Sequence, residues 1–188
     1  GASQDAATET PPPTTNISGN EASTSGASFS FVTPTEFVEL PSKGEFYPEG
    51  HPLHGAETVE IRHMTAKDED ILTSKTLLRK GIALDRMIKN LLVDKRIDIE
   101  SLLVGDKNAI IVTARKTGYG SDYATNVTCP SCGTSQQAVF DLEETEVTDV
   151  TAYQQLPSVE RHGSYFDVEL PRSGVTARVR LLTGVDEA

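Results

Sequence analysis

Cys129 and Cys132 are the residues whose type and spacing most clearly suggest chemistry in this chain. They stand in the sequence Cys129-Pro-Ser-Cys-Gly133, between two segments with the alternation of β-strands. A tight turn of this kind points both sulfurs at one position, and Gly133 admits the backbone geometry that thiolate coordination needs. The motif is therefore typical of a zinc knuckle. Tetrahedral zinc needs four ligands, however, and the chain has no second cysteine pair.

Histidines are candidates for the missing ligands. His51 and His54 lie close together in a long predicted loop, and His162 is another candidate. Several outcomes stay open: zinc held by Cys129, Cys132, His51 and His54, a metal shared with another chain, free thiols, a local disulfide, or no metal. A thioredoxin-like redox pair is disfavoured, because the two cysteines do not open a helix after a strand.

The other polar motifs have plainer interpretations. Asp68, Glu69 and Asp70 are consecutive, so on a helix they would spread over about 200° and suit a helix start better than a metal site. The segment 118–120 lacks the Lys-Ser/Thr of a phosphate-binding loop. No nucleophile, base and orienting acid can be assembled from the four histidines. We therefore expect a protein that is not an enzyme.

One supersecondary unit occurs twice in the chain, and its first copy contains His51 and His54 and ends in the acidic run 68–70. The stretch Val38-Glu-Leu-Pro-Ser-Lys-Gly44 recurs as Val168-Glu-Leu-Pro-Arg-Ser-Gly174. The stretch from Val59 to Glu69 recurs, more loosely, from Ala177 to Glu187. The two offsets are 130 and 118 residues, so the first copy has 12 more residues in its connecting loop. The repeat indicates two versions of one supersecondary unit.

Both copies predict the same local structure. A strand ends at a proline, the chain turns through a glycine, and a second strand leads into a helix. Thr65 with Asp68, and Thr183 with Asp186, resemble capping boxes at the start of that helix.

Two further expectations follow from the repeat. Arg62 and Arg180 occupy matching positions, where a local salt bridge is favoured over a paired contact with an anion or a partner. The first copy continues as a helix, whereas the second stops at Ala188, just after its cap. We therefore expect the gene product to extend beyond Ala188, and the mass of the intact protein would test this.

The middle of the chain predicts three helices. The first runs over residues 66–80, with Gly81 as a left-handed stop. The second is defined by an apolar stripe, and the third begins with Asp106 as its N-cap and ends before Gly118. We expect these helices to form a small bundle. The apolar residues expected in its core are Leu84, Met87, Ile88, Leu91, Leu92, Ile110, Ile111 and Ala114.

After the helices the pattern changes to β. Tyr123–Thr128 and Ala138–Leu142 are predicted strands on either side of the cysteine turn, and residues 145–151 form a polar connector. The second hairpin places Phe166, Val168 and Leu170 on one face. The predicted fold class is α+β: β-hairpins flanking a small central helical bundle, with a zinc-knuckle-like β-hairpin insertion and a disordered or extended N-terminal arm.

The N-terminal arm has a different composition from the rest. Residues 1–28 are rich in Ala, Ser, Thr and Pro, and they bury too little apolar surface to offset the entropy of ordering. We therefore divide the chain into an arm (1–35), a region with the first hairpin, the helices and the cysteine knuckle (36–144), and a region with the second hairpin and a truncated helix (145–188).

Composition excludes several classes of protein. The chain has 188 residues and a formal charge of −11, so a broad basic face for nucleic acid is not expected. No apolar run approaches the roughly 20 residues of a membrane span, and the opening residues do not resemble a secretory signal. Two cysteines do not make a disulfide framework, which favours synthesis in a reducing compartment.

Several stretches of the chain resemble the T-even-type phage baseplate family, in particular its small hub-associated proteins. The similarity covers roughly residues 37–188. It is carried by Leu40-Pro-Ser-Lys-Gly-Glu-Phe-Tyr-Pro-Glu-Gly-His-Pro-Leu53, Glu60-Ile-Arg-His-Met-Thr-Ala-Lys-Asp-Glu-Asp-Ile-Leu-Thr-Ser74, Leu102-Leu-Val-Gly-Asp-Lys-Asn-Ala-Ile110, Thr117-Gly-Tyr-Gly120 and Val127-Thr-Cys-Pro-Ser-Cys-Gly133.

The resemblance implies a structural component of a contractile-tail baseplate, in its hub or inner part, without catalytic activity. Its partners would be several other baseplate or tail proteins, and it would reside in the virion after synthesis in the host cytoplasm. One alternative is an assembly chaperone that is absent from the mature virion. Another is a zinc-dependent adaptor that uses the cysteine knuckle for recognition.

Overall fold

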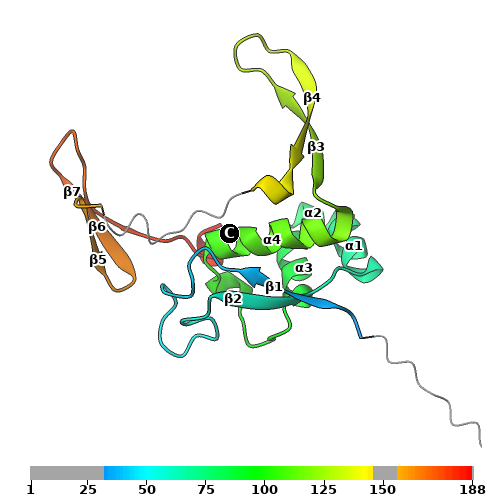
Figure 1. Cartoon of the computed structure of the whole chain (residues 1–188), viewed down its shortest axis with the longest axis horizontal. Helices are drawn as coiled ribbons and strands as arrows, with labels where there is room; N and C mark the ends of the chain where they lie inside the picture. The colour runs from blue at the N-terminus through cyan, green and yellow to red at the C-terminus, as the bar shows by residue number, and fades with distance from the viewer. Residues whose placement is uncertain (1–31, 146–155, 188) are drawn as a thin grey trace, which may run out of the picture. The chain divides into compact units, whose positions relative to one another are not determined.

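The first hairpin shows how the alternating sequence pattern becomes a buried sheet face. The computed structural model describes residues 32–145 and 156–187 (Figure 1). Strand β1 (Thr35–Glu39) pairs antiparallel with β2 (Thr58–Arg62), with Val38 opposite Val59. Side chains alternate between the two faces of a strand, so Val38, Val59 and Ile61 are buried on the inner face.

The helices of the described part are α1 (Ala66–Thr73), α2 (Lys75–Arg79), α3 (Ala83–Leu91) and α4 (Val104–Tyr119). Side chains of α1, α3 and α4 pack in the core with this inner face. The hydrophobic core joins the hairpin to α3, α4 and the segments around them. Its largest fully buried apolar side chains are Ile61, Ile88, Leu91, Leu92, Leu102 and Ile110.

The predicted first helix is two helices. The interpretation of residues 66–80 as one helix was wrong, because Ser74 has an extended backbone (ψ 109°) between α1 and α2. The Thr73 hydroxyl donates to the carbonyl oxygen of Glu69, and Ser and Thr side chains compete with helical backbone bonds in this way. Gly81, with φ of 71°, follows α2 as the predicted left-handed stop.

The second predicted helix is confirmed as α3, with one correction to its buried face. Met87, Ile88, Leu91 and Leu92 are buried as predicted, whereas Leu84 is 46% exposed. Ala83 is buried instead of Leu84, so the buried stripe begins one residue earlier than the sequence interpretation placed it.

The third predicted helix, α4, is longer at both ends than predicted. It starts before Asp106, which is buried inside the first turn and is not an N-cap. At the other end α4 continues through Gly118, where an added Cβ would lie 3.1 Å from the sulfur of Met64, so this glycine permits close packing. The helix ends at Gly120, whose φ is 83°. Ile110 and Ala114 are buried as predicted, and Ile111 is half-buried.

Two further sheets follow the helices. Strands β3 (Asp122–Thr128) and β4 (Ser135–Asp141) form the predicted hairpin around the cysteine turn. The second sheet has three strands, β5 (Val159–His162), β6 (Tyr165–Glu169) and β7 (Thr176–Arg180), in the order β5-β6-β7. Strand β5 was not predicted, because its four residues Val-Glu-Arg-His contain only one apolar side chain.

Between residues 32–145 and 156–187, short 3-10 helices also connect these elements: η1 (Ile99–Ser101), η2 (Leu142–Glu144) and η3 (Gly184–Glu187). The predicted truncated helix after the second hairpin is the 3-10 helix η3. Its flanks are held at the start of α4, where Leu182 O accepts from Val104 N and Gly184 N donates to Leu102 O, each at 2.9 Å.

The observed fold is mixed α+β, with small antiparallel sheets around helices, as predicted. The predicted N-terminal arm lies outside the described residues up to residue 31, and β1 already begins at Thr35. Most of the predicted connector 145–151 also lies outside them. None of the helices in the described part is both long and apolar enough to cross a membrane.

Candidate functional site

The repeated unit has the same backbone register in both copies. We call residues 35–69 the first module and residues 165–187 the second module. Thr35 pairs with Arg62 in the first, and Tyr165 pairs with Arg180 in the second. The three pairs that follow correspond in the same way, as does the last one, Glu39 with Thr58 and Glu169 with Thr176. The predicted internal repeat is therefore confirmed in three dimensions.

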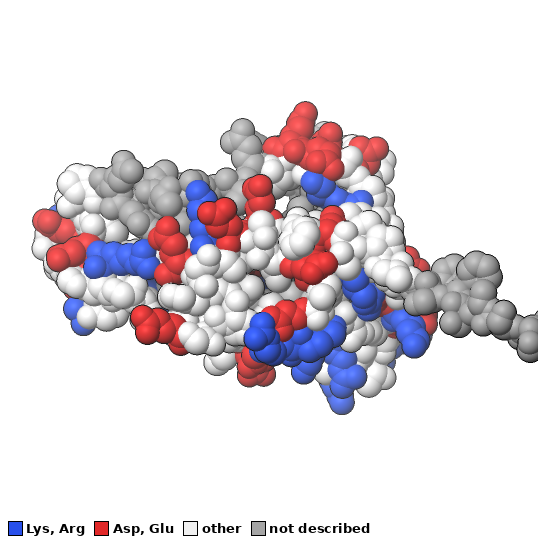
Figure 2. Space-filling view, turned by 60° about the horizontal axis from the view of Figure 1, so that its bottom comes forward, with Lys and Arg blue, Asp and Glu red and all other residues white. Residues whose placement is uncertain are grey.

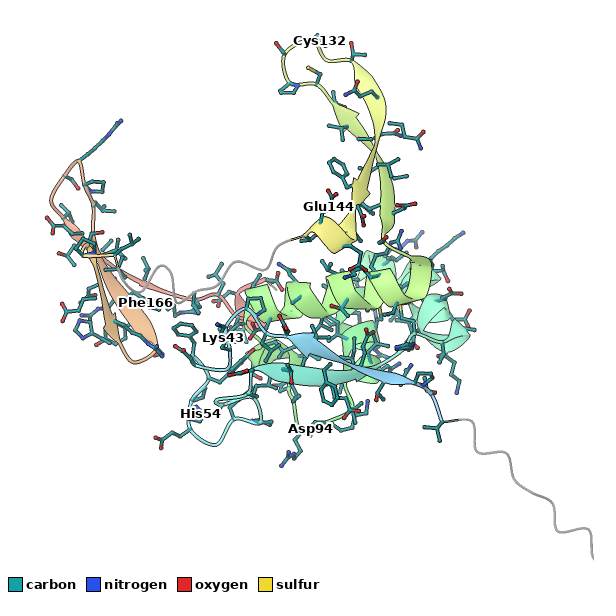
Figure 3. All side chains as sticks on the ribbon, viewed as in Figure 1. Lys43, His54, Asp94, Cys132, Glu144 and Phe166 are labelled. Atoms are coloured by element: carbon teal, nitrogen blue, oxygen red, sulfur yellow. The ribbon has the colours of Figure 1, made fainter. Side chains whose placement is uncertain are left out.

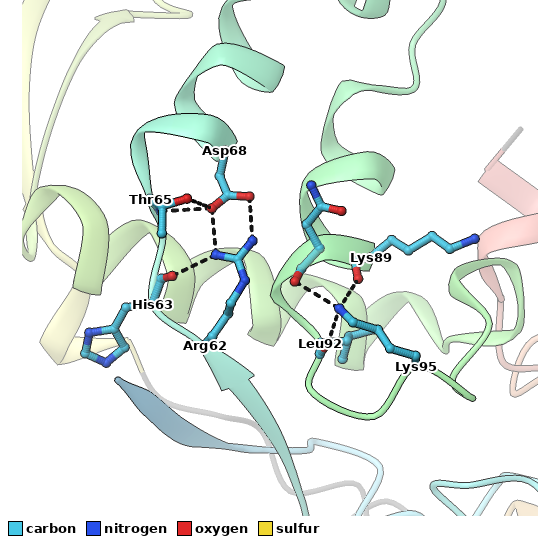
Figure 4. A network of polar contacts seen from close by, with 8 residues as sticks. Arg62, His63, Thr65, Asp68, Lys89, Leu92 and Lys95 are labelled. Carbon is cyan, nitrogen blue, oxygen red and sulfur yellow. Dashed lines mark hydrogen bonds and ion pairs between the residues drawn. The ribbon is translucent and has the colours of Figure 1, made fainter. Parts of the chain in front are cut away.

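An arginine-aspartate pair closes the first module (Figure 4). The Arg62 guanidinium donates two parallel hydrogen bonds to the Asp68 carboxylate, at 2.7 and 2.9 Å. The backbone N–H and the hydroxyl of Thr65 donate to the same carboxylate, each at 2.8 Å. Arg62 also donates to the carbonyl of His63 at 3.0 Å. The predicted capping box at the start of α1 and the local salt bridge of Arg62 are both confirmed.

The second module makes the same five contacts. Arg180 donates to the two oxygens of Asp186 at 2.7 and 2.6 Å, and to the carbonyl of Leu181 at 3.3 Å. The backbone N–H and hydroxyl of Thr183 donate to Asp186 at 2.9 and 3.1 Å. This agreement follows from sequence spacing alone, because all partners lie within six residues of one another.

The two carboxylates have lowered pKa values. Burial by itself would raise the pKa of Asp68, but the hydrogen bonds from Arg62 and Thr65, with the charge of Arg62, outweigh it and lower the pKa to about 2. In the second module the hydrogen bond from Arg180, followed by that from the Thr183 backbone, lowers the pKa of Asp186. Both aspartates are therefore ionised at neutral pH and accept the hydrogen bonds that form the cap.

A buried carboxylate joins the long β1–β2 loop to α4. Asp106 accepts from the backbone N–H and the hydroxyl of Ser42, at 3.0 and 2.6 Å, and from the Tyr47 hydroxyl at 2.7 Å. The same hydroxyl of Tyr47 accepts from Leu103 N at 3.1 Å. Burial, with the nearby charge of Asp106, raises the pKa of Tyr47. This network leaves no signal in the sequence, because its partners are about 60 residues apart, and the prediction of Asp106 as an N-cap was wrong.

The predicted metal-ligand histidines take part in the packing of this loop. The His51 ring stacks on Tyr47 with the centroids 4.4 Å apart, and its Nε2 is hydrogen-bonded to Ser101 Oγ at 2.9 Å. His54 Nδ1 is hydrogen-bonded to the carbonyl of Tyr47 at 2.7 Å. Burial lowers the pKa of His51, although the charge of Asp98 acts in the opposite direction.

The predicted metal-ligand cysteines lie elsewhere, at the β3–β4 turn. Figure 3 shows Cys132 at the tip of that hairpin and His54 in the β1–β2 loop. Among the described residues, no group of three or more His, Cys, Asp or Glu side chains is arranged to hold a metal ion. The structure thus does not gather Cys129, Cys132, His51 and His54, and His162 contacts Tyr165 in the second sheet. The zinc interpretation stays a prediction that requires ligands from elsewhere.

A hydrogen bond within the cysteine turn lowers the pKa of the Cys132 thiol. Both cysteines are free, and Cys132 Sγ is hydrogen-bonded to Thr134 Oγ1 at 3.4 Å. This hydrogen bond is the largest contribution to the lowered pKa of Cys132. The backbone closes the turn with Gly133 N donating to the carbonyl of Cys129 at 2.9 Å.

Comparison with known protein families places this geometry in a functional context. The family described as T4 bacteriophage base plate protein matches residues 33–177, which contain the first hairpin, the cysteine turn and strand β6, and end within strand β7. The chain belongs to this family. Comparison with curated proteins and with solved structures found no match. The suspected resemblance to phage baseplate proteins is thereby confirmed at the level of the family.

The two modules of this baseplate-family chain differ in how their apolar faces are covered. Val38, Leu40, Val59 and Ile61 are buried in the first module. Their counterparts are Val168, Leu170, Ala177 and Val179, of which Leu170 and Val179 are 42% and 46% exposed. Val168 and Ala177 are half-buried, and at one end of this face Phe166 packs on Phe46 with the ring centroids 5.7 Å apart.

Charged residues of the baseplate-family chain are mixed in sign on the face shown in Figure 2. There Lys and Arg lie in small groups next to Asp and Glu. Several such neighbours are local ion pairs, such as Arg96 with Asp94 and Arg178 with Asp167. The expectation that the partners do not include nucleic acid stays a prediction.

Proposed function

We propose that this chain is a structural component of a contractile-tail baseplate, in its hub or inner part, and that it acts by packing against several different tail proteins. It needs no catalytic residues for this role. The single observation that carries the proposal is the exposed apolar face of the second module, whose counterpart in the first module is part of the core.

The physical argument rests on what an apolar sheet face requires. In the first module, α3 and α4 bury the face, and covering a Leu or Val side chain contributes roughly 1.5–3 kcal/mol. In the second module Leu170, Val175 and Val179 remain exposed among the described residues. Contiguous apolar patches on a protein surface commonly mark a protein–protein interface. We infer that neighbouring baseplate chains cover this face in the assembled tail.

The matched polar contacts support a rigid role for the second module. Its Arg180–Asp186 cap and its hydrogen bonds to the start of α4 hold the hairpin in place without help from the exposed face. A face that is exposed and still pre-shaped loses little conformational entropy on binding.

The test combines virion composition with one surface variant. We expect the protein in purified virions by mass spectrometry, and we expect Val179→Asp to reduce its incorporation at least about tenfold while the protein stays folded, because a buried unpaired charge costs several kcal/mol. The control is Thr176→Asp, on the opposite face of β7, which should incorporate normally.

Three results would contradict the proposal. Absence of the wild-type protein from complete virions, together with loss of tails when it is deleted, would identify an assembly chaperone. Equal incorporation of Val179→Asp and the control would show that the face is not an interface. If deletion of the protein impairs infection of the host but leaves the tails intact, the zinc-dependent adaptor would be favoured.

A further inference from the structure

Strand β1 has one edge on which no strand of the described part of the chain is paired. Among the described residues β1 pairs only with β2, as a two-stranded sheet. Pro34 O accepts from His63 N, and Leu40 N donates to Glu57 O, each at 2.8 Å, so the even-numbered residues direct their backbone groups toward the β2 side. Backbone direction alternates along a strand, and the N–H and C=O groups of Phe37 and Glu39 therefore point to the opposite, unpaired edge.

The second module shows what occupies the equivalent edge. There β5 pairs antiparallel with β6, with Val159 opposite Val168 and Arg161 opposite Phe166. Glu169, the counterpart of Glu39, donates its backbone N–H to Ser158 O at 2.9 Å. Because the two modules share their register, the β1 edge has the geometry that accepts a third strand on β6.

A groove runs beside this edge. It has a volume of about 520 Å³ and is lined on one side by residues 36–39 of β1 and on the other by Ala109, Val112 and Lys116 of α4. Val38 is buried, while Phe37 is 69% exposed and lies on the outer face of the strand. An extended segment placed in the groove would therefore meet backbone groups on its β1 side and apolar side chains of α4 on its inner side.

The groove also contains an unsatisfied acid. Glu36 Oε1 is buried and has no hydrogen-bond partner in the described part of the chain, and His63 Nε2 lies 3.8 Å from it. Its counterpart in the second module, Phe166, stands opposite Arg161. A strand added in the same register places one of its side chains opposite Glu36. A Lys or Arg there would supply the missing donor and complement the charge.

We propose that the free edge of β1 is a strand-addition site for an extended segment of a partner chain. The segment would run antiparallel to β1 in the register of β5 on β6, with a basic residue opposite Glu36 and an apolar residue opposite Val38. Main-chain hydrogen bonds supply the affinity and the two side chains supply the specificity. The inference deepens the proposed function and rests on it for the partner being another tail protein.

The experiment uses the full chain and a peptide probe with the sequence of residues 158–163, Ser-Val-Glu-Arg-His-Gly, which forms the third strand in the second module. Amide hydrogen exchange is followed by NMR. At saturating peptide we expect exchange at Phe37 and Glu39 to slow by about tenfold or more, while Val38 and Leu40, already bonded toward β2, change little. A second peptide with Glu in place of the arginine should bind roughly fivefold more weakly.

A pair of variants isolates the backbone contribution. Phe37→Pro removes the edge N–H, and proline is tolerated on edge strands, whereas Phe37→Ala keeps the N–H and removes only the exposed ring. We expect the proline variant to lose the peptide and the alanine variant to bind within about twofold of the wild type. If the proline variant does not fold, the exchange pattern of the wild type with the two peptides decides.

Three outcomes would overturn the inference. One is protection of Phe37 and Glu39 in the free protein at low concentration, and another is no added protection with peptide. The third is protection that rises with protein concentration without peptide, since a second copy would then occupy the edge. None of these results depends on whether the protein is found in virions, so failure of this inference and failure of the proposed function are distinguishable.

Discussion

The first and second modules are one local structure in two environments. Both have the same strand register and the same Arg–Thr–Asp cap. In the first, the apolar face is buried under helices and its loop is tied to α4 by Asp106. In the second, Leu170 and Val179 of the equivalent face are exposed and a third strand is added at the edge. Local sequence is therefore enough to set the strand register and the cap, whereas the free energy that the unit contributes to folding depends on what covers its apolar face.

The turn glycines should give the largest contrast between the modules. Gly44 and Gly174 both have positive φ, at 70° and 66°, but an added Cβ at Gly44 would lie 2.3 Å from Ala56 N, and at Gly174 it would meet open space. We expect Gly44→Ala to lower the free energy of unfolding by about 3 kcal/mol or more, through backbone displacement. Gly174→Ala should cost only the left-handed strain of about 1 kcal/mol.

Urea denaturation followed by circular dichroism measures both variants. Equal losses of unfolding free energy for Gly44→Ala and Gly174→Ala would mean that the long loop packs no more tightly than the short one. The proposed difference between the two modules would then not hold at their turns.

Core truncation should give the next contrast. Ile61 is fully buried and its counterpart Val179 is 46% exposed. Ile61→Ala should lower the free energy of unfolding by about 3 kcal/mol, from lost burial and a residual cavity. Val179→Ala should lower it by less than about 1 kcal/mol. A large loss for Val179→Ala in the isolated chain would show that the second face is already covered there.

Substitution of the two cap aspartates should give a smaller difference in unfolding free energy between the modules. Asp68 is fully buried and accepts charged hydrogen bonds, so Asp68→Asn should cost about 2 kcal/mol, since it leaves Arg62 without its partner. Asp186 is more exposed, and Asp186→Asn should cost less. Chemical denaturation at pH 7 in low and high salt is the measurement, and a larger salt effect on the Asp186 cap would sharpen the contrast.

The pH dependence of the first cap follows from the lowered pKa of Asp68. A carboxyl with a pKa of about 2 in the folded chain and near 3.9 when unfolded stabilises the fold at all pH values above about 4. This stability is lost as the pH falls from about 4 toward 2, because the unfolded state takes up the proton first. Acid titrations of wild type and Asp68→Asn should therefore converge at low pH, and parallel curves would contradict this.

The cysteine turn should have the smallest effect on either module. Cys129→Ser should change the free energy of unfolding by no more than about 0.5 kcal/mol, because the turn makes no core contact. Two thiolates are half of a tetrahedral set, so the purified chain alone should not retain stoichiometric zinc. Stoichiometric zinc that disappears in Cys129→Ser would instead show that further ligands reach the turn.

Much of the fold could be predicted because its signals are local. The cap partners Thr65 and Asp68 are three residues apart, and the stripe of α3 repeats at helical spacing. The same holds for the β-hairpin around Cys129 and Cys132. The predictions that were wrong concern residues whose conformation depends on a contact with a distant part of the chain. Gly118 remains helical beside Met64. The interpretation of Asp106 as a cap was wrong because Ser42 and Tyr47 donate hydrogen bonds to it.

The amino-acid sequence by itself determined the repeated hairpin and its arginine-aspartate cap, since the strand and turn pattern is visible within each copy and the cap partners lie within six residues of one another. Only the tertiary structure decided which copy is buried, where His51 and His54 pack, and which strand edge stays unpaired. These depend on contacts between segments tens of residues apart. Such contacts form only when distant segments of the chain come together, and the spacing of residues within one segment does not indicate which segments will meet.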